Sequence, residues 1–204
     1  MDVIPRTLMM PLLATALTFG APAHALEEPA YEIVGKIDHP EGAIEIRRYA
    51  PMTVARTRIT GKFSRAGHQA FPRLGGYIFG ANARNEKIEM TAPVSQAKDN
   101  SDGYWISFVM PRSWSLQTLP SPRDNSVELI DVPARTMAVA MYRGGWSSKR
   151  YARHESRLLD AIASSHWLTY GEPEWARYNP PMWPGFMKRN EIMLQVTPGA
   201  TVVR

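Results

Sequence analysis

The sequence contains no cysteine among its 204 residues. Disulfide bonds, a cysteine nucleophile and a lipid anchor, which requires a cysteine, are therefore excluded. Long hydrophobic runs are also scarce. The longest candidate, residues 8–17, is shorter than the roughly 20 residues that a membrane-spanning helix needs. The folded protein must accordingly be stabilised by its apolar core, for which 44% hydrophobic residues are sufficient.

The first 25 residues have the pattern of a secretory signal peptide. Arg6 precedes the apolar run of residues 8–17, and residues 23–25 (AHA) form a small-x-small cleavage site. We therefore expect a mature chain that begins at Leu26, lies in the periplasm or is secreted, and has no transmembrane segment once the signal is removed.

The charged residues show a basic excess without basic clusters. The chain has 24 Lys and Arg against 19 Asp and Glu, a net charge of +5. Such a balance favours anionic partners such as nucleic acid, anionic lipid or a carboxylate ligand. Because the bases never form a run longer than two, and because an exported protein rarely meets nucleic acid, we expect no nucleic-acid binding.

Signatures of the common enzyme classes are missing as well. The sequence has no G-x-S-x-G, no H-E-x-x-H and no glycine-rich phosphate loop. The turn at residues 99–103 (DNSDG) resembles the start of a calcium loop but lacks the required acids. The 11 methionines are assigned to the core or the signal peptide, not to a copper site. These absences favour a binding protein over an enzyme.

Strand and helix patterns occur twice in the same order along the chain. The first set comprises strands at residues 43–49 and 52–59, a helix at 62–77 and a strand at 104–110; the second comprises strands at 127–130 and 136–142, a helix at 147–164 and strands at 174–178 and 191–196. Neither half has enough strands for its own core. We therefore predict a single α+β domain over residues 26–204, with repeat one at 31–110 and repeat two at 126–197. The two repeats should merge into a twisted, mainly antiparallel β-barrel flanked by two long helices.

Three motifs resemble the SOUL haem-binding proteins. They are residues 49–51 (YAP), residues 87–94 (KIEMTAPV), and residues 178–184 (YNPPMWP) running into residues 188–192 (KRNEI). The chain is similar to that family over nearly its whole mature length and is identified as a bacterial, exported member. The resemblance implies a pseudo-twofold barrel of two β-α-β-β repeats. It also implies binding of haem or another tetrapyrrole in an apolar cleft between the first helix and the loop before the last strand.

The same resemblance nominates side chains for that cleft. Phe71 falls at an apolar porphyrin contact, and Tyr178, Met182 and Trp183 lie in the loop. Positions that are basic in animal members are His68, Gly76 and Trp183 here. The bases that remain available for the haem propionates are Arg65, Arg73, Lys188 and Arg189, each of which is alternatively a solvated surface charge.

Two histidines and the segment at residues 87–94 need separate interpretation. A helical projection places His68 off the core-facing stripe, which makes it the candidate iron ligand, with Met90, Met182 and Tyr178 as weaker rivals. His154 projects toward the core and is expected to be buried and hydrogen-bonded. The segment at residues 87–94 is predicted to correspond to residues 174–181 of the second repeat. It is either a structural bulge that closes the barrel, or it presents Met90 to the ligand.

The expected function is therefore non-covalent binding of a tetrapyrrole by a monomer, for its carriage, buffering or sequestration. One alternative is a gyrase-inhibitor-like effector-binding module for another amphiphile, such as a lipophilic cation. Its candidate acids are Glu89, Glu174 and Glu191. The other alternative is an enzyme that modifies haem.

Overall fold

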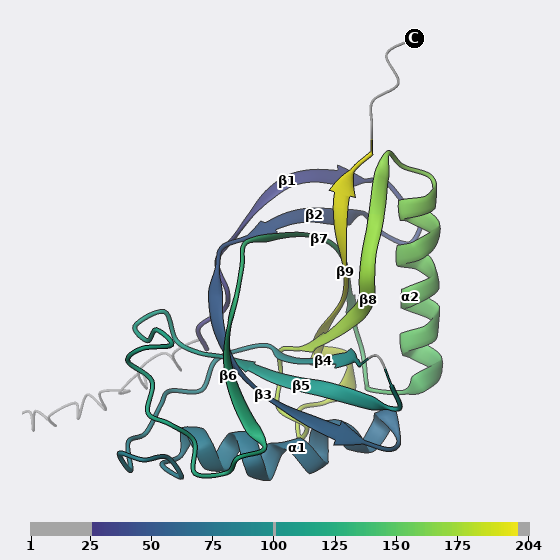
Figure 1. Ribbon diagram of the computed structural model, residues 1–204. Helices are drawn as coiled ribbons and strands as arrows, with labels where there is room; N and C mark the ends of the chain where they lie inside the picture. The colour runs from purple at the N-terminus through teal and green to yellow at the C-terminus, as the bar shows by residue number, and fades with distance from the viewer. Residues whose placement is uncertain (1–25, 100, 200–204) are drawn as a thin grey trace, which may run out of the picture.

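The structure, a computed structural model, describes residues 26–99 and 101–199 (Figure 1). The predicted signal peptide thus lies outside the described residues. The elements are, in chain order, β1 (Tyr31–Ile37), β2 (Ile44–Tyr49), β3 (Met52–Thr60), α1 (Phe63–Ile78), β4 (Val94–Lys98), β5 (Gly103–Val109), β6 (Val127–Val132), β7 (Arg135–Arg143), α2 (Ser148–Ala163), β8 (Trp167–Arg177), the 3-10 turn η1 (Gly185–Met187) and β9 (Arg189–Pro198).

All nine strands belong to one curved, antiparallel sheet. Its order is β1-β2-β7-β9-β8-β4-β5-β3-β6. The outermost strands β1 and β6 pair only with β2 and β3, respectively, so the sheet is open and the predicted closed barrel is wrong. The alternation of apolar residues predicts strands. It does not show whether two edges meet, because closure depends on twist and stagger accumulated over every strand.

The two helices pack on one face of this sheet, and their predicted positions are confirmed to within about a residue at each end. α1 packs on β3 and β5, and α2 packs on β7, β8 and β9. The apolar stripe of α1 faces inward, with Ala70 and Leu74 fully buried. α2 begins where the Ser147 side chain accepts a hydrogen bond from the Arg150 amide. Each helix therefore covers its own core on its half of the sheet.

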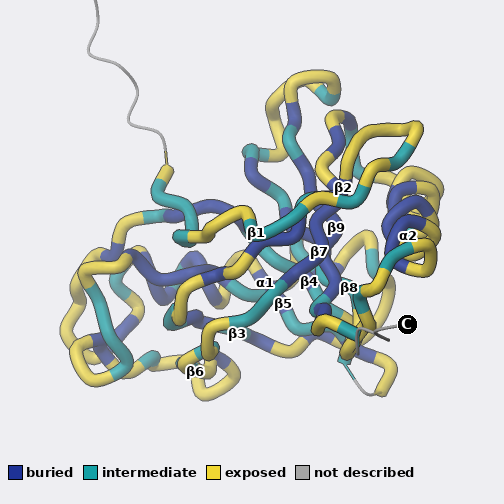
Figure 2. Tube along the Cα trace, turned by 90° about the horizontal axis from the view of Figure 1, so that it is seen from above, coloured by how far each residue is buried: buried dark blue, intermediate teal, exposed yellow. Residues whose placement is uncertain are grey.

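The opposite, concave face carries a smaller third core. It comprises Tyr49, Ala92, Met137, Val139, Ala176, Tyr178 and Met193. Viewed from above, buried positions run along the central strands β7 and β9 and along the inner side of α2 (Figure 2). The concave face thus carries buried apolar side chains at the sheet centre, and it lies away from both helices.

Three features differ from the sequence prediction. Strands β1 and β4 were not predicted, and β8 begins at Trp167, well before the predicted start at residue 174. The first half of β8 is exposed on both faces. It therefore lacks the alternation of buried and exposed residues from which a strand is predicted. Residues 87–93 precede β4, which begins at Val94, whereas residues 174–177 end β8, so, contrary to the prediction, the two segments do not occupy matching positions relative to a strand.

Candidate functional site

The predicted site residues on α1 lie on different sides of the helix. Arg65 and His68 are exposed, and Phe71 is half-exposed, with its ring 5.9 Å from that of Phe108. Arg73 lies about 200° around the helix from Phe71. Its guanidinium donates to the Thr57 hydroxyl and the Arg58 carbonyl on β3. His68 and Phe71 therefore share a side of α1 that Arg73 does not reach.

The loop that follows β8 presents four large apolar side chains to solvent. The exposed fractions are 80% for Met182, 43% for Trp183, 77% for Phe186 and 45% for Met187. Single exposed apolar residues are ordinary, but four within six positions are a concentrated patch. We call residues 178–188 the apolar loop. Sequence reasoning nominated Met182 and Trp183 and missed the other two, although they directly continue the same motif.

The apolar loop is fixed at both ends. The Lys188 ammonium donates to the Pro181 carbonyl at 2.7 Å, and the Lys188 carbonyl accepts from the Gly144 amide. The Arg189 amide donates to the side chain of Asn179. Prolines 180, 181 and 184 restrict the backbone further. The apolar side chains are therefore held outward by a rigid turn, which lowers the entropy cost of placing a ligand on them.

Two side chains of the apolar loop that were predicted to contact the ligand bind other residues of the protein instead. Lys188 is buried, with its ammonium 4.3 Å from the centre of the Trp146 ring. Tyr178 is also buried, and its hydroxyl donates to Glu191 at 2.7 Å. Neither group is free to hold a propionate or an iron atom without breaking these contacts. Both act as supports of the loop.

Basic residues flank the apolar loop, and within the described residues only two of them, Arg153 and Arg189, pair with acids, namely Glu41 for Arg153 and Glu28 and Glu191 for Arg189. Residues 141–154 and 178–190 contain six Lys and Arg and no Asp or Glu. The two segments touch where the Cβ position of Gly185 lies 3.4 Å from the Gly145 nitrogen. Within the described part of the chain, no carboxylate lies at ion-pair distance from Arg143, Lys149 or Arg150. An anion that approached this end of the molecule would thus meet uncompensated positive charge.

Arg177 connects the start of the apolar loop to α1. Its guanidinium lies 2.7 Å from the position that a Cβ on Gly67 would occupy, so a larger residue there would require the guanidinium to shift. The same group donates to Gln96 at 2.7 Å and to the Tyr151 hydroxyl at 3.0 Å. Arg177 therefore fixes the loop entrance against the first half of α1, the part that carries His68.

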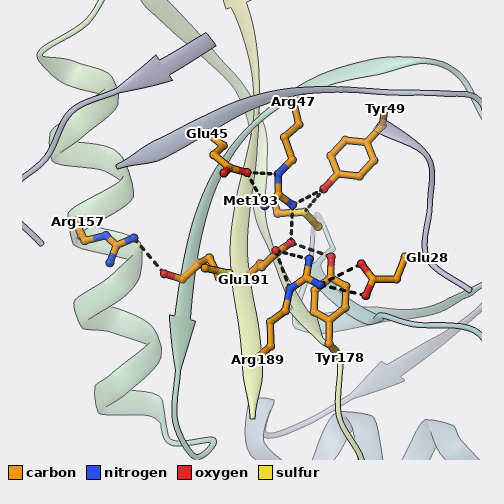
Figure 3. A network of polar contacts seen from close by, with 10 residues as sticks. Glu28, Glu45, Arg47, Tyr49, Arg157, Tyr178, Arg189, Glu191 and Met193 are labelled. Carbon is orange, nitrogen blue, oxygen red and sulfur yellow. Dashed lines mark hydrogen bonds and ion pairs between the residues drawn. The ribbon is translucent and has the colours of Figure 1, made fainter. Parts of the chain in front are cut away.

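A buried charge network supports the apolar loop from the concave side (Figure 3). Glu191 is fully buried, and its carboxylate accepts hydrogen bonds from Arg47, Arg189 and Tyr178 at 2.7–3.2 Å. Arg47, only 3% exposed, comes from β2, and Arg189 and Glu191 come from β9. The network thereby joins two strands to the loop entrance.

The network sets the protonation of its members. Burial, the largest single effect, would lower the pKa of Arg47, but attraction to Glu191 and Tyr49 and the hydrogen bonds to Tyr49 and Glu45 together outweigh it and raise that pKa. Burial, reinforced by the Glu191 charge, raises the pKa of Tyr178, and the same two causes raise the pKa of Tyr49 to about 12. Both phenols therefore stay neutral at physiological pH, and Tyr178 remains a hydrogen-bond donor.

His154, in α2, is buried as the sequence predicted. Its ring stacks on that of Tyr142 at 4.1 Å, and its Nδ1 atom has no partner among the described residues. Burial lowers the pKa of His154, and the nearby Arg157 and Arg153 lower it further. The sequence predicted a hydrogen-bonded His154, and within the described residues its Nδ1 atom is not hydrogen-bonded. His154 is a neutral core residue.

The lowered pKa of His154 predicts a pH-dependent stability. The unfolded chain takes up a proton near pH 6.5 but the folded chain only at lower pH, so stability falls as pH falls below about 6.5. We expect the melting temperature of His154→Phe, which retains a ring beside Tyr142, to fall less than that of the wild type between about pH 7 and pH 5. Thermal unfolding at each pH measures this. Equal slopes for both proteins would show that His154 is not responsible.

The remaining sequence candidates do not form a metal centre. Met90 is half-buried and packs against the core beneath α1. Across residues 26–99 and 101–199, no group of three or more His, Asp or Glu side chains is arranged to hold a metal ion. None of the helices in these ranges has the length and apolar character needed to cross a bilayer.

Comparison with known sequences identifies relatives along almost the whole described chain. The model of a family described as "SOUL heme-binding protein" matches residues 26–195. Heme-binding protein 2 of Homo sapiens is 27% identical over 183 residues, which cover 85% of this chain and 88% of that protein. Heme-binding protein 1 of Xenopus laevis is 25% identical over 174 residues, which cover 79% and 87%, respectively.

Solved structures share the fold at low sequence identity. The C-terminal domain of EcmrR superposes with a TM-score of 0.57 at 15% identity, covering 76% of this chain and 97% of that one. An uncharacterized conserved protein from Listeria innocua gives a TM-score of 0.57 at 11% identity, covering 76% and 92%. Such identities support a common α+β architecture and nothing about ligands.

Proposed function

The chain belongs to the SOUL heme-binding protein family, and we propose that it binds haem or a related tetrapyrrole non-covalently between α1 and the apolar loop. The names of its relatives, Heme-binding protein 1 and 2, support haem as the ligand. The observation that carries the location is the rigid exposed patch of Met182, Trp183, Phe186 and Met187.

The chemistry of this surface fits a flat macrocycle that carries carboxylates. Burying roughly 300 Å² of apolar surface is worth about 7 kcal/mol before association costs. An exposed base paired with a propionate adds at most about 1 kcal/mol. Affinity would therefore come mainly from the apolar side chains. Arg143, Lys149 and Arg150, which have no carboxylate at ion-pair distance within residues 26–99 and 101–199, and Arg65 on α1, favour an anionic ligand in general.

His68 is the residue that we assign to iron. Its imidazole is exposed on the side of α1 that also carries Phe71. When bound, haem supplies an iron atom with open axial positions that accept an imidazole nitrogen. Met182 is a second candidate because its thioether is exposed, whereas Tyr178 is held by Glu191.

The role that we propose is reversible carriage, buffering or sequestration by a monomer outside the cytoplasm. The signal-like residues 1–25 support the location, and the absence of enzyme motifs supports a binding role. We also infer that the fold is a duplication. The pairing of β3 with β5 and β6 corresponds to that of β7 with β9 and β2, which supports this inference.

The test is a titration of the protein, expressed from the full chain, with haem and with iron-free protoporphyrin, followed by absorbance. We expect saturation near one equivalent for both ligands, because the apolar surface contacts the ring rather than the iron. His68→Ala should shift the Soret band of bound haem and leave protoporphyrin binding unchanged. No spectral change with either ligand would overturn the proposal.

A lipophilic-cation site is less well supported. Such a site needs a free buried acid, but Glu174 accepts two hydrogen bonds from Arg135, and Glu191 lies within the charge network. Glu89 is exposed. The haem-modifying alternative predicts loss of the Soret band under a reductant, whereas a carrier leaves the spectrum intact.

A further inference from the structure

Arg177 lies between the two elements that border the proposed tetrapyrrole site. It is the last residue of β8 and directly precedes the apolar loop. Its side chain reaches α1, where its Nη1 atom lies 2.7 Å from the position that a Cβ on Gly67 would occupy. Gly67 and Phe71 are four residues apart in α1, a spacing that places both on the same side of a helix. The guanidinium is therefore about one helical turn from Phe71, a predicted ligand contact.

The charge of Arg177 lacks an acidic partner in the described part of the chain. Its Nε atom donates to the Tyr151 hydroxyl at 3.0 Å, and its Nη2 atom donates to the Gln96 side chain at 2.7 Å. Both acceptors are neutral. Across residues 26–99 and 101–199, the Nη1 atom has no hydrogen-bond partner. Since a guanidinium carries five N–H donors, the donors on Nη1 are available to a ligand.

Two positive charges lie near the ring of Trp146. The guanidinium of Arg177 is 5.2 Å from the centre of this ring, and the ammonium of the buried Lys188 is 4.3 Å from it. Phe63 and Tyr151 contribute two more rings near Arg177, at 5.8 Å and 5.7 Å, respectively. Aromatic rings attract a cation without neutralising it, and they exclude water that would screen its charge. A carboxylate at Nη1 would therefore be held more strongly than one at a fully solvated base.

The guanidinium of Arg177 is held in one orientation. Gln96, which accepts from Nη2, is fully buried, and its amide nitrogen donates to the Phe63 carbonyl at the start of α1. Tyr151, which accepts from Nε, is buried in α2. Because these two acceptors fix the plane of the guanidinium, little side-chain entropy is lost when a ligand binds. Nη1 therefore faces the Gly67 side of α1 before a ligand arrives.

We infer that Arg177 donates from Nη1 to a carboxylate of the bound tetrapyrrole and thereby selects porphyrins that carry a free acid. The inference rests on the proposed tetrapyrrole site and adds a specificity-determining residue to it. The motifs in the sequence did not nominate Arg177, because only the folded chain shows that its side chain reaches Gly67. Binding leaves the supports of the side chain in place, since Nε and Nη2 keep their acceptors.

The test compares iron-free protoporphyrin with its dimethyl ester by fluorescence titration of the full protein. The ester keeps the ring and removes both negative charges, and the absence of iron eliminates any contribution from His68. We expect the acid to bind roughly tenfold more tightly than the ester, because a hydrogen bond to a charged group supplies about that factor. Arg177→Gln should lose most of this preference, while its affinity for the ester stays unchanged. A residue that merely supported the loop would weaken the binding of both ligands equally.

Further variants locate the effect at Nη1. Arg73→Gln removes the same charge from the side of α1 that faces β3 and should keep the wild-type ratio of the two affinities. Gly67→Ala keeps the charge of Arg177 but displaces Nη1, so it should weaken binding of the acid several-fold and leave binding of the ester unchanged. The matched Gly76→Ala, whose new Cβ has only an ordinary contact with Ala81 at 3.8 Å, should weaken neither.

The outcomes separate this inference from the proposed function. Equal affinity of the wild type for acid and ester would overturn the inference alone. So would a wild-type ratio in Arg177→Gln, or in Gly67→Ala if the first variant does not fold. A wild type that binds neither ligand would overturn the tetrapyrrole site as well.

Discussion

Replacing Glu191 with glutamine is expected to lower the free energy of unfolding by about 3–5 kcal/mol. The variant keeps a side chain that can accept from Tyr178, but it removes the negative charge that Arg47 and Arg189 face. Arg47 would then be a buried cation whose remaining carboxylate partner, Glu45, is only half-buried. Removing one charge of a buried ion pair is costly because the other charge stays buried without a partner.

Chemical denaturation measures this loss, and Glu32→Gln is the matched control. Glu32 also pairs with an arginine, Arg48, but both side chains are more than half exposed. Exposed pairs contribute at most about 1 kcal/mol. Equal losses in the two variants would mean that burial of the Glu191 network contributes little.

The second large effect is expected in the apolar loop. The double variant Trp183→Ala/Phe186→Ala should weaken haem binding roughly 100-fold or more, since truncating a central aromatic contact commonly costs about 2 kcal/mol. Its fold should persist, because both side chains are exposed and the loop is held by hydrogen bonds from the Lys188 ammonium and the Arg189 amide. The loss would therefore report on the binding surface and not on stability.

Local patterns in the sequence were sufficient for much of the fold. Both helices are confirmed because their apolar stripes repeat with helical period over four turns. The strand predictions failed where buried and exposed residues do not alternate along the strand or where the strand is short. The first half of β8 is exposed on both faces, β4 is only five residues long, and the open edges of the sheet depend on its total curvature.

The site was less predictable than the fold, because the role of a polar residue depends on distant partners. Lys188 and Tyr178 appeared to be ligand contacts in the motif, but Trp146 and Glu191 engage them. Arg73 projects toward β3. Phe186 and Met187 are exposed because the loop contacts residues 144–145. Local composition does not predict that contact.

The most direct test of the central claim is a haem titration, followed by absorbance, of three proteins in parallel. They are the wild type, Trp183→Ala/Phe186→Ala, and the control Leu168→Ala/Tyr170→Ala, which removes equally exposed apolar side chains from β8. Tight binding by the wild type and the control, with roughly 100-fold weaker binding by the loop variant, is the predicted result. Equal affinity in all three proteins would contradict a tetrapyrrole site at the apolar loop.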